Sequence, residues 1–185
     1  LGGHGVSSFA PRTRTHSSNP QPRPASFLHE ERLIIDPRND FCDPRGSLCI
    51  PGADRDMARL AALIEDAGGA LSGIEVPLNS HAEMDRSHPG WWRDASGRPP
   101  APLCRVSASD RRSGRLKATR AGDTETGLAY LETPERGQRF PHTIWPAHCL
   151  TDTWGYGIYP ALDGALTAWE NDQRRVRELR KDQNP

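Results

Sequence analysis

The chain has 185 residues and a formal net charge of +0 at pH 7, and hydrophobic residues occupy only 35% of its positions. This length is typical of one domain with a tail, and the low hydrophobic content predicts that part of the chain lies outside any core. The neutral charge balance gives no reason to expect nucleic acid or a membrane surface as a partner. No apolar run approaches the ~20 residues that cross a bilayer.

The first part of the chain is predicted to be a disordered tail covering residues 1–31, followed by one domain over residues 32–185. Residues 1–28 contain no acid and are rich in Ser, Pro, Gly and Arg, so they bury too little apolar surface to offset the entropy of ordering. This composition also fits an organelle transit peptide. The cysteines match no zinc or redox spacing and are typical of a reduced, cytoplasmic protein; they are Cys42, Cys49, Cys104 and Cys149.

The domain opens with a predicted strand, helix and strand. "RLIID" (32–36) is a short apolar run that ends at a proline, typical of a strand buried on both faces. Apolar residues then recur at helical spacing from Met57 to Ile64, and Gly68-Gly69 is expected to end this helix. "GIEVPLNS" (73–80) is the next strand. Such a unit implies an α/β fold with a parallel sheet.

The rest of the chain is predicted to add an insertion and two further strands. Residues 85–140 have no clear period and are expected to form an irregular insertion with minor strands, with a short helix at "TGLAYLETPERG" (126–137). "HTIWP" (142–146) is predicted to be a third buried strand. "YPALDGALTAWEND" (159–172) places four apolar residues on one helical face, and "RRVRELRK" (174–181) favours a fourth strand over a helix.

Polar residues follow each of these predicted strands. In an open parallel sheet, ligands bind beyond the carboxyl ends of the strands, so these residues are expected to converge on one edge. They are Asp36 after the first strand, Asn79, His81 and His88 after the second, Trp145, His148 and Cys149 after the third, and Lys181 after the fourth.

Three of these side chains are imidazoles, which are common ligands of zinc, iron and manganese. His81, His88 and His148 are therefore a candidate divalent-metal site with an open position for substrate or water. The alternative is that they are surface or hydrogen-bonding histidines. The two interpretations stay open on the residues alone.

The remaining strand-end residues allow two interpretations as well. Asp36 either caps a turn or acts as a general base whose pKa is tuned by burial and by a neighbouring cation. Lys181 is a candidate for that cation, or else belongs to a solvated face with the arginines around it. Trp145 and Phe41 either form an aromatic slot for a flat ring or belong to the core.

Four motifs together carry a family resemblance. "LIIDPRNDFCDPRGSLCIPGADRDMARL", "LNSHAEMDRSHPGWW", "IWPAHCLTDTWG" and "KDQNP" occur in an order and spacing that resemble the nicotinamidase/isochorismatase-like cysteine hydrolases, from about Arg32 to Pro185. The resemblance implies a three-layer α/β/α sandwich around a parallel sheet, incomplete at the C-terminus. It implies hydrolysis of a small amide, nicotinamide to nicotinate plus ammonia in NAD salvage, and a homo-oligomer is a further expectation. The metal-free isochorismatase-type reaction is the alternative chemistry.

The resemblance also assigns roles to single residues. Asp36 and Lys181 match two members of the family's Asp–Lys–Cys triad. Phe41 and Trp145 match positions that flank the substrate ring. The divalent metal, zinc before iron or manganese, would bind the pyridine nitrogen, and its ligands would be Asn79, His81 and His148, with His88 as a further ligand.

The sequence departs from the family pattern at several positions. The family's nucleophilic cysteine follows the lysine motif, Cys149 is not its equivalent, and the 185-residue chain is therefore expected to be inactive. The family's metal-binding acid is Asn79, the usual glutamine is Arg38, and the glycine after the lysine is Asp182. A catalytically inactive protein that binds metal or ligand is thus the second hypothesis.

Overall fold

The computed structural model describes residues 30–67, 69–136, 141–171 and 174–181. The predicted tail, residues 1–31, lies almost entirely outside the described residues, and so does Asp182. Within the described part, no helix is both long and apolar enough to span a bilayer.

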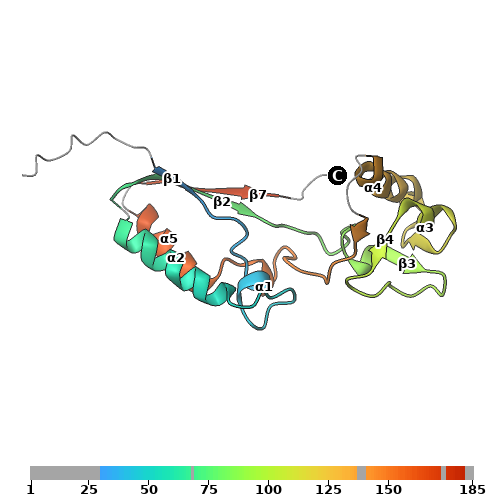
Figure 1. The fold of residues 1–185 in the computed structure, drawn as a ribbon, viewed down its shortest axis with the longest axis horizontal. Helices are drawn as coiled ribbons and strands as arrows, with labels where there is room; N and C mark the ends of the chain where they lie inside the picture. Colours follow the sequence, from blue (N-terminus) through green and yellow to red (C-terminus); the bar gives the residue numbers. More distant parts are fainter. Residues whose placement is uncertain (1–29, 68, 137–140, 172–173, 182–185) are drawn as a thin grey trace, which may run out of the picture.

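A parallel sheet forms the centre of the larger part of the molecule (Figure 1). Its strands are β1 (Glu30–Leu33), β2 (Leu71–Leu78) and β7 (Val176–Arg180), hydrogen-bonded in the order β1-β2-β7. Both pairings are parallel, so the carboxyl ends of all three strands lie at the same edge. The predicted α/β fold with a parallel sheet is confirmed, and residues 174–181 contain a strand, as predicted.

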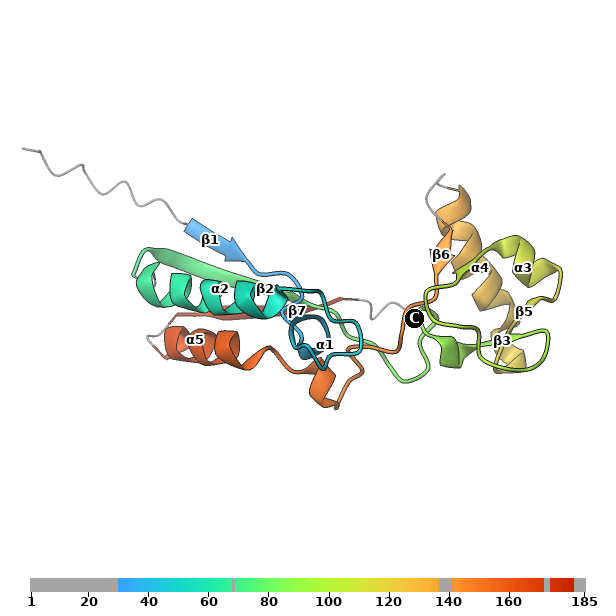
Figure 2. The same ribbon diagram turned by 60° about the horizontal axis from the view of Figure 1, so that its bottom comes forward.

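Two helices pack against one face of this sheet. They are α2 (Ala53–Ala67) and α5 (Pro160–Glu170), which lie side by side on the same face (Figures 1 and 2). The strand β2 alternates, and its buried Ile74, Val76 and Leu78 meet the apolar faces of both helices. The four apolar residues predicted for the later helix are all buried in this core: Leu162, Ala165, Leu166 and Trp169.

The opposite face of the sheet has no helix among the described residues. Ile34 is 4% exposed because it points toward the helices, whereas its neighbours Leu33 and Ile35 are each 61% exposed. The prediction of a strand buried on both faces is therefore wrong for this segment. The second helical layer of the expected three-layer sandwich is not part of the chain that the structure describes.

The described residues between 89 and 144 form a second, smaller packed unit, in which the predicted insertion has the minor strands and the short helix that were expected. Its two antiparallel pairs join β3 (Trp92–Asp94) with β5 (Leu116–Ala118) and β4 (Arg105–Val106) with β6 (His142–Thr143). Its helices are α3 (Ala108–Arg112) and α4 (Thr124–Arg136), the latter at the site of the predicted short helix. The buried core contains Trp91, Trp92, Val106, Ala108, Leu116, Leu131 and Ile144.

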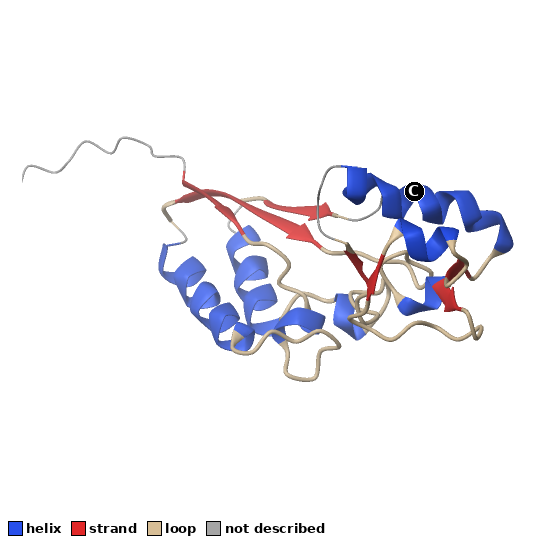
Figure 3. Ribbon diagram, turned by 45° about the vertical axis from the view of Figure 1, so that its right-hand side comes forward, coloured by secondary structure: helices blue, strands red, loops and turns tan. Residues whose placement is uncertain are grey.

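The segment "HTIWP" does not join the central sheet, so its prediction as a third parallel strand is wrong. His142–Thr143 pairs antiparallel with Arg105–Val106, and Ile144 is buried in the core of the smaller unit. Its apolar residue is buried as expected, but in another core. Loops join the two units (Figure 3). The remaining short elements are α1 (Asn39–Cys42) and the 3-10 turns η1 (Pro89–Trp91), η2 (Ala121–Asp123) and η3 (Trp154–Tyr156).

Adjacent isoleucines provide a direct test of the one-sided packing. We expect Ile34→Ala to lower the free energy of unfolding by about 2–4 kcal/mol, because it leaves a cavity beneath α2 and α5. Ile35→Ala on the exposed face should cost less than about 1 kcal/mol. Urea unfolding of both variants measures the difference, and equal losses would contradict the arrangement described here.

Candidate functional site

The first group of site residues lies where β1, β2 and β7 end. Asp36 Oδ2 accepts a hydrogen bond from Lys181 Nζ at 2.6 Å, and Asp36 Oδ1 accepts one from the backbone N–H of Asn79 at 2.8 Å. The backbone N–H of Asp36 bonds to Pro77 and that of Lys181 bonds to Leu78, so the sheet itself sets this meeting point. Asp36 adopts a positive φ of 55°, a conformation that asparagine and aspartate tolerate better than most residues.

The second group is a cluster of three buried histidines. One ring nitrogen each of His81, His88 and His148 lies within 4.8 Å of the other two. The segment after β2 supplies the first two residues, and the segment leading to η3 supplies the third. His81 and Cys149 hold these segments together, because the backbone N–H of His81 donates to Cys149 O at 3.0 Å.

Hydrogen bonds fix the orientation of two of the rings. His81 Nδ1 lies 3.0 Å from a carboxylate oxygen of Asp85, and His148 Nδ1 lies 2.7 Å from the carbonyl oxygen of Pro146. Carboxylate and carbonyl oxygens only accept, so both Nδ1 atoms carry the hydrogen and both Nε2 atoms of the neutral rings keep a lone pair. His81 Nε2 is buried without a hydrogen-bond partner among the described residues. Such a nitrogen, beside two other imidazoles, fits a divalent metal ion.

Asn79 connects the two groups. Its side-chain Nδ2 lies 3.1 Å from His148 Nε2, while its backbone N–H donates to Asp36. The side chain of Asn79 therefore contacts the histidine cluster, while its backbone contacts the Asp36–Lys181 pair.

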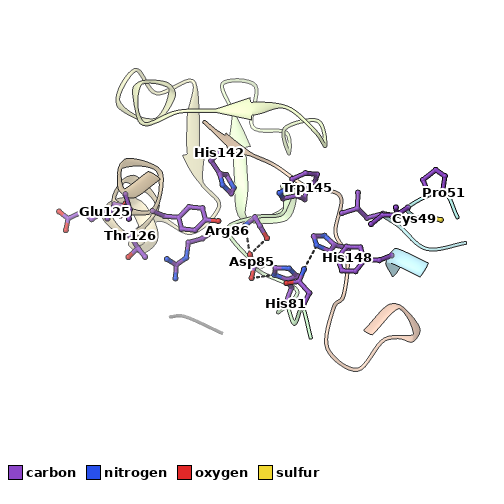
Figure 4. Close-up of a pocket in the computed structure, with 18 residues that line it drawn as sticks. Cys49, Pro51, His81, Asp85, Arg86, Glu125, Thr126, His142, Trp145 and His148 are labelled. Carbon is purple, nitrogen blue, oxygen red and sulfur yellow. Dashed lines mark hydrogen bonds and ion pairs between the residues drawn. The ribbon is translucent and has the colours of Figure 1, made fainter. Parts of the chain in front are cut away.

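A cavity of about 1260 Å³ is lined by two of the clustered histidines, His81 and His148 (Figure 4). Phe41, Asn79, His81, Trp145 and His148 line it together with Asp85, Tyr130 and His142, so both predicted ring-binding aromatics face this space. The ring of Phe41 lies 5.3 Å from that of His148, and Trp145 remains 41% exposed. Asp36 and Lys181 are not among the lining residues, whereas Asn79, whose backbone N–H bonds to Asp36, is one of them.

No protein-family model and no curated protein matches the chain. Among solved structures, that of the yeast nicotinamidase Pnc1p is similar with a TM-score of 0.50 at 17% identity over 80% of this chain. The same yeast nicotinamidase bound to the inhibitor nicotinaldehyde gives 0.51 at 18% identity, again over 80% of this chain. The chain has the nicotinamidase fold. It spans 55% of each of these two structures, about half their length.

Burial favours the neutral form of two of the three clustered histidines in this nicotinamidase-like fold. It lowers the pKa of His88 to about 4, with His81 and His148 adding positive charge nearby. Burial also lowers the pKa of His148. Burial alone would raise the pKa of Asp85, but hydrogen bonds from His81 and Ser87 bring it well below its ordinary value. At neutral pH the site thus offers the neutral imidazoles of His88 and His148, the form that binds metals, beside the charged carboxylate of Asp85.

The thiols of two nearby cysteines are poor nucleophiles. Burial, reinforced by the charge of Asp40, raises the pKa of Cys149 to about 12. Burial and the neighbouring Cys49 raise the pKa of Cys42 to about 11. Both thiols stay protonated at neutral pH, whereas reactive cysteines need a thiolate.

Sequence reasoning missed two buried positioning groups. Asp40 Oδ2 accepts a hydrogen bond from the backbone N–H of Cys149 at 2.6 Å, and Oδ1 accepts one from that of Ser47 at 3.0 Å. This carboxylate ties α1 to the loop that carries His148. Arg38 is also buried: its Nε donates to Asn79 O at 3.0 Å and its guanidinium stacks on Tyr156. The polar run "PRNDF" directly after a strand is the signal that pointed toward both.

The depressed pKa of His88 predicts the pH dependence of stability. The unfolded chain binds a proton near pH 6.5 and the folded chain only near pH 4, so stability should fall as the pH drops through this window. We expect the metal-free protein to lose roughly 1–2 kcal/mol from this residue between pH 7 and 5. Urea unfolding at both pH values, with His88→Gln beside the parent, measures it, and an unchanged slope in the variant would contradict the shift.

Proposed function

We propose that the protein is a cysteine-type amide hydrolase acting on nicotinamide or a similar pyridine amide. The observation that supports it is the placement of a carboxylate–lysine pair and a buried three-histidine cluster on either side of Asn79. A cytoplasmic role in NAD salvage follows from the same proposal.

The proposed role of Asp36 is proton transfer. Its carboxylate takes the proton of a nucleophilic thiol and returns it to the leaving amide nitrogen, which departs as ammonia. The thiolate attacks the amide carbonyl carbon, and the C–N bond breaks as ammonia leaves, which forms a thioester. Water then hydrolyses the thioester to the acid and the free thiol. Lys181, 2.6 Å away, favours the charged forms of both partners. The family resemblance implies that the cysteine follows Lys181 in sequence.

The proposed role of the histidine cluster is to hold a divalent metal, zinc before iron or manganese. When bound, the ion would act as a Lewis acid for the ring nitrogen of the substrate. His81, His88 and His148 would hold it, with the amide of Asn79 as a neutral fourth group. Phe41 and Trp145 face the same cavity and would flank the pyridine ring.

A metal- or ligand-binding protein without turnover is the second candidate function. The raised pKa values of Cys42 and Cys149 favour it, because neither thiol is activated. A metal-free isochorismatase-type reaction is less well supported, since it gives no role to the buried, unpaired Nε2 of His81.

A comparison of nicotinamide with benzamide tests whether the protein recognises the ring nitrogen of the ligand, because both ligands carry the same amide group. We expect nicotinamide to bind the zinc-loaded protein at least ~10-fold more tightly than benzamide, and the preference to vanish without zinc, because only one of the two rings carries a nitrogen. Calorimetric titration with each ligand measures it. Equal affinities, or no effect of zinc, would rule out the proposed binding mode.

Ammonia release distinguishes the hydrolase from the binding protein in the same samples. In a protein that turns over, Asp36→Asn should lower the rate ~100-fold or more while nicotinamide affinity changes only a few-fold. If the protein binds nicotinamide and releases no ammonia, the binding function is the correct one.

The neutral amide at position 79 predicts a gain of affinity. Asn79→Asp should tighten zinc binding by roughly 10-fold, because it places a charge beside His148 where the amide has none. Asn171→Asp, at the exposed C-terminal end of α5, is the matched control and should leave zinc affinity unchanged. Competition with a chelating dye measures both. An unaltered affinity in Asn79→Asp would remove this residue from the metal site.

A further inference from the structure

We propose that Asp85 is a positioning residue of the metal centre. Its carboxylate turns His81 so that Nε2 faces the metal, and it supplies from outside the ligand set the negative charge that Asn79 lacks. This inference rests on the metal centre of the proposed function but not on turnover.

Both oxygens of the Asp85 carboxylate are engaged (Figure 4). Oδ2 lies 3.0 Å from His81 Nδ1, while Oδ1 accepts hydrogen bonds from the backbone N–H of Ser87 at 2.8 Å and from its hydroxyl at 2.6 Å. The Ser87 bonds hold the carboxylate still. The histidine bond then transmits this fixed position to the ring.

The contact decides which nitrogen of His81 can bind a metal. A carboxylate only accepts, so His81 donates from Nδ1 and keeps its lone pair on Nε2. That Nε2 atom is buried without a hydrogen-bond partner in the described part of the chain. A carboxylate on the far nitrogen also makes the imidazole a stronger donor to a metal.

Charge points to the same residue. An imidazole that binds a metal and a side-chain amide are both uncharged ligands, so His81, His88, His148 and Asn79 would leave a divalent ion without a charged ligand. Within the described ranges, the Asp85 carboxylate is the one that hydrogen-bonds to an imidazole ring of the cluster. It therefore lies where a compensating charge is needed, one imidazole ring away from the proposed ion.

The chain contains a matched control for the turn itself. Asp94 makes the same local contacts: its Oδ1 accepts from the backbone N–H of Ser96 at 2.8 Å and from its hydroxyl at 2.6 Å. Its other partner is the backbone of Arg98, and no histidine of the described residues bonds to it. Substitution of Asp94 thus measures the effect of losing such a turn on the protein at a place away from the metal centre.

The decisive experiment compares zinc affinity in Asp85→Asn, Asp85→Ala and Asp94→Asn. We expect a 10–100-fold loss in both Asp85 variants and none in Asp94→Asn. Asparagine should be at least as harmful as alanine: with Oδ1 still on Ser87, its NH₂ group faces His81 Nδ1 and moves the ring hydrogen to Nε2. A purely structural role predicts the reverse order, because asparagine preserves the turn.

Nitrogen NMR of the His81 ring in the metal-free protein provides a second readout. The parent should show the Nδ1–H tautomer, and Asp85→Asn should shift it toward Nε2–H. Parental zinc affinity in Asp85→Asn, or an equal loss in Asp94→Asn, would overturn the proposal. Should Asp85→Ala fail to fold, Asp85→Asn decides alone. A parent that binds no zinc overturns the metal centre together with this inference, whereas absent ammonia release leaves the inference intact.

Discussion

The contact between Asp36 and Lys181 joins the two outer strands of the parallel sheet across the end of β2. It brings together residues 145 positions apart, and it depends on all three strands running the same way. Asn79 directly follows the middle strand, and its backbone N–H donates a hydrogen bond to the other oxygen of the same carboxylate. The side chain of Asn79 in turn contacts His148, a member of the histidine cluster. The site is therefore a consequence of strand direction, and any shift of β7 by one residue would move the lysine to the opposite face of the sheet.

The convergence of polar residues was predictable because it depends only on strand direction. Asp36, Asn79 and Lys181 each end a strand, and the rule for parallel sheets places such residues together. The position of "HTIWP" was not predictable from its pattern, since an apolar run shows that a segment is buried but not in which core. Ile144 completes the core around Trp91 and Trp92 instead. His148 nevertheless reaches the site, because the loop after Ile144 returns to the end of β2.

The burial of β1 shows a second limit of sequence reasoning. Three apolar residues in a row allow a strand to be covered on both faces, yet only Ile34 is covered here. Alternation in β2 reveals the covered face through Ile74, Val76 and Leu78, and Ile34, directly after β1, is buried in the same core. Whether a second layer exists is a property of other segments, so no local pattern in β1 determines it. The positioning roles of Asp40 and Asp85 were not predicted from the sequence, because the partners of these carboxylates lie in turns and on distant loops.

The donor set also bears on which ion the centre would prefer. The three imidazoles offer nitrogen, and such sets suit zinc, iron or copper better than magnesium or calcium, which prefer oxygen. An acid at position 79 would add a charged oxygen directly and strengthen binding of every divalent ion. Asp85 adds its charge through His81 instead, where distance and the intervening ring weaken the plain Coulomb attraction. What remains is its effect on ring orientation and basicity, which favours ions that bind imidazole. A site with Asn79 at this position and Asp85 behind His81 would therefore bind divalent metals more weakly than a site with an acid at position 79. Its preference for metals that bind imidazole nitrogen would be stronger.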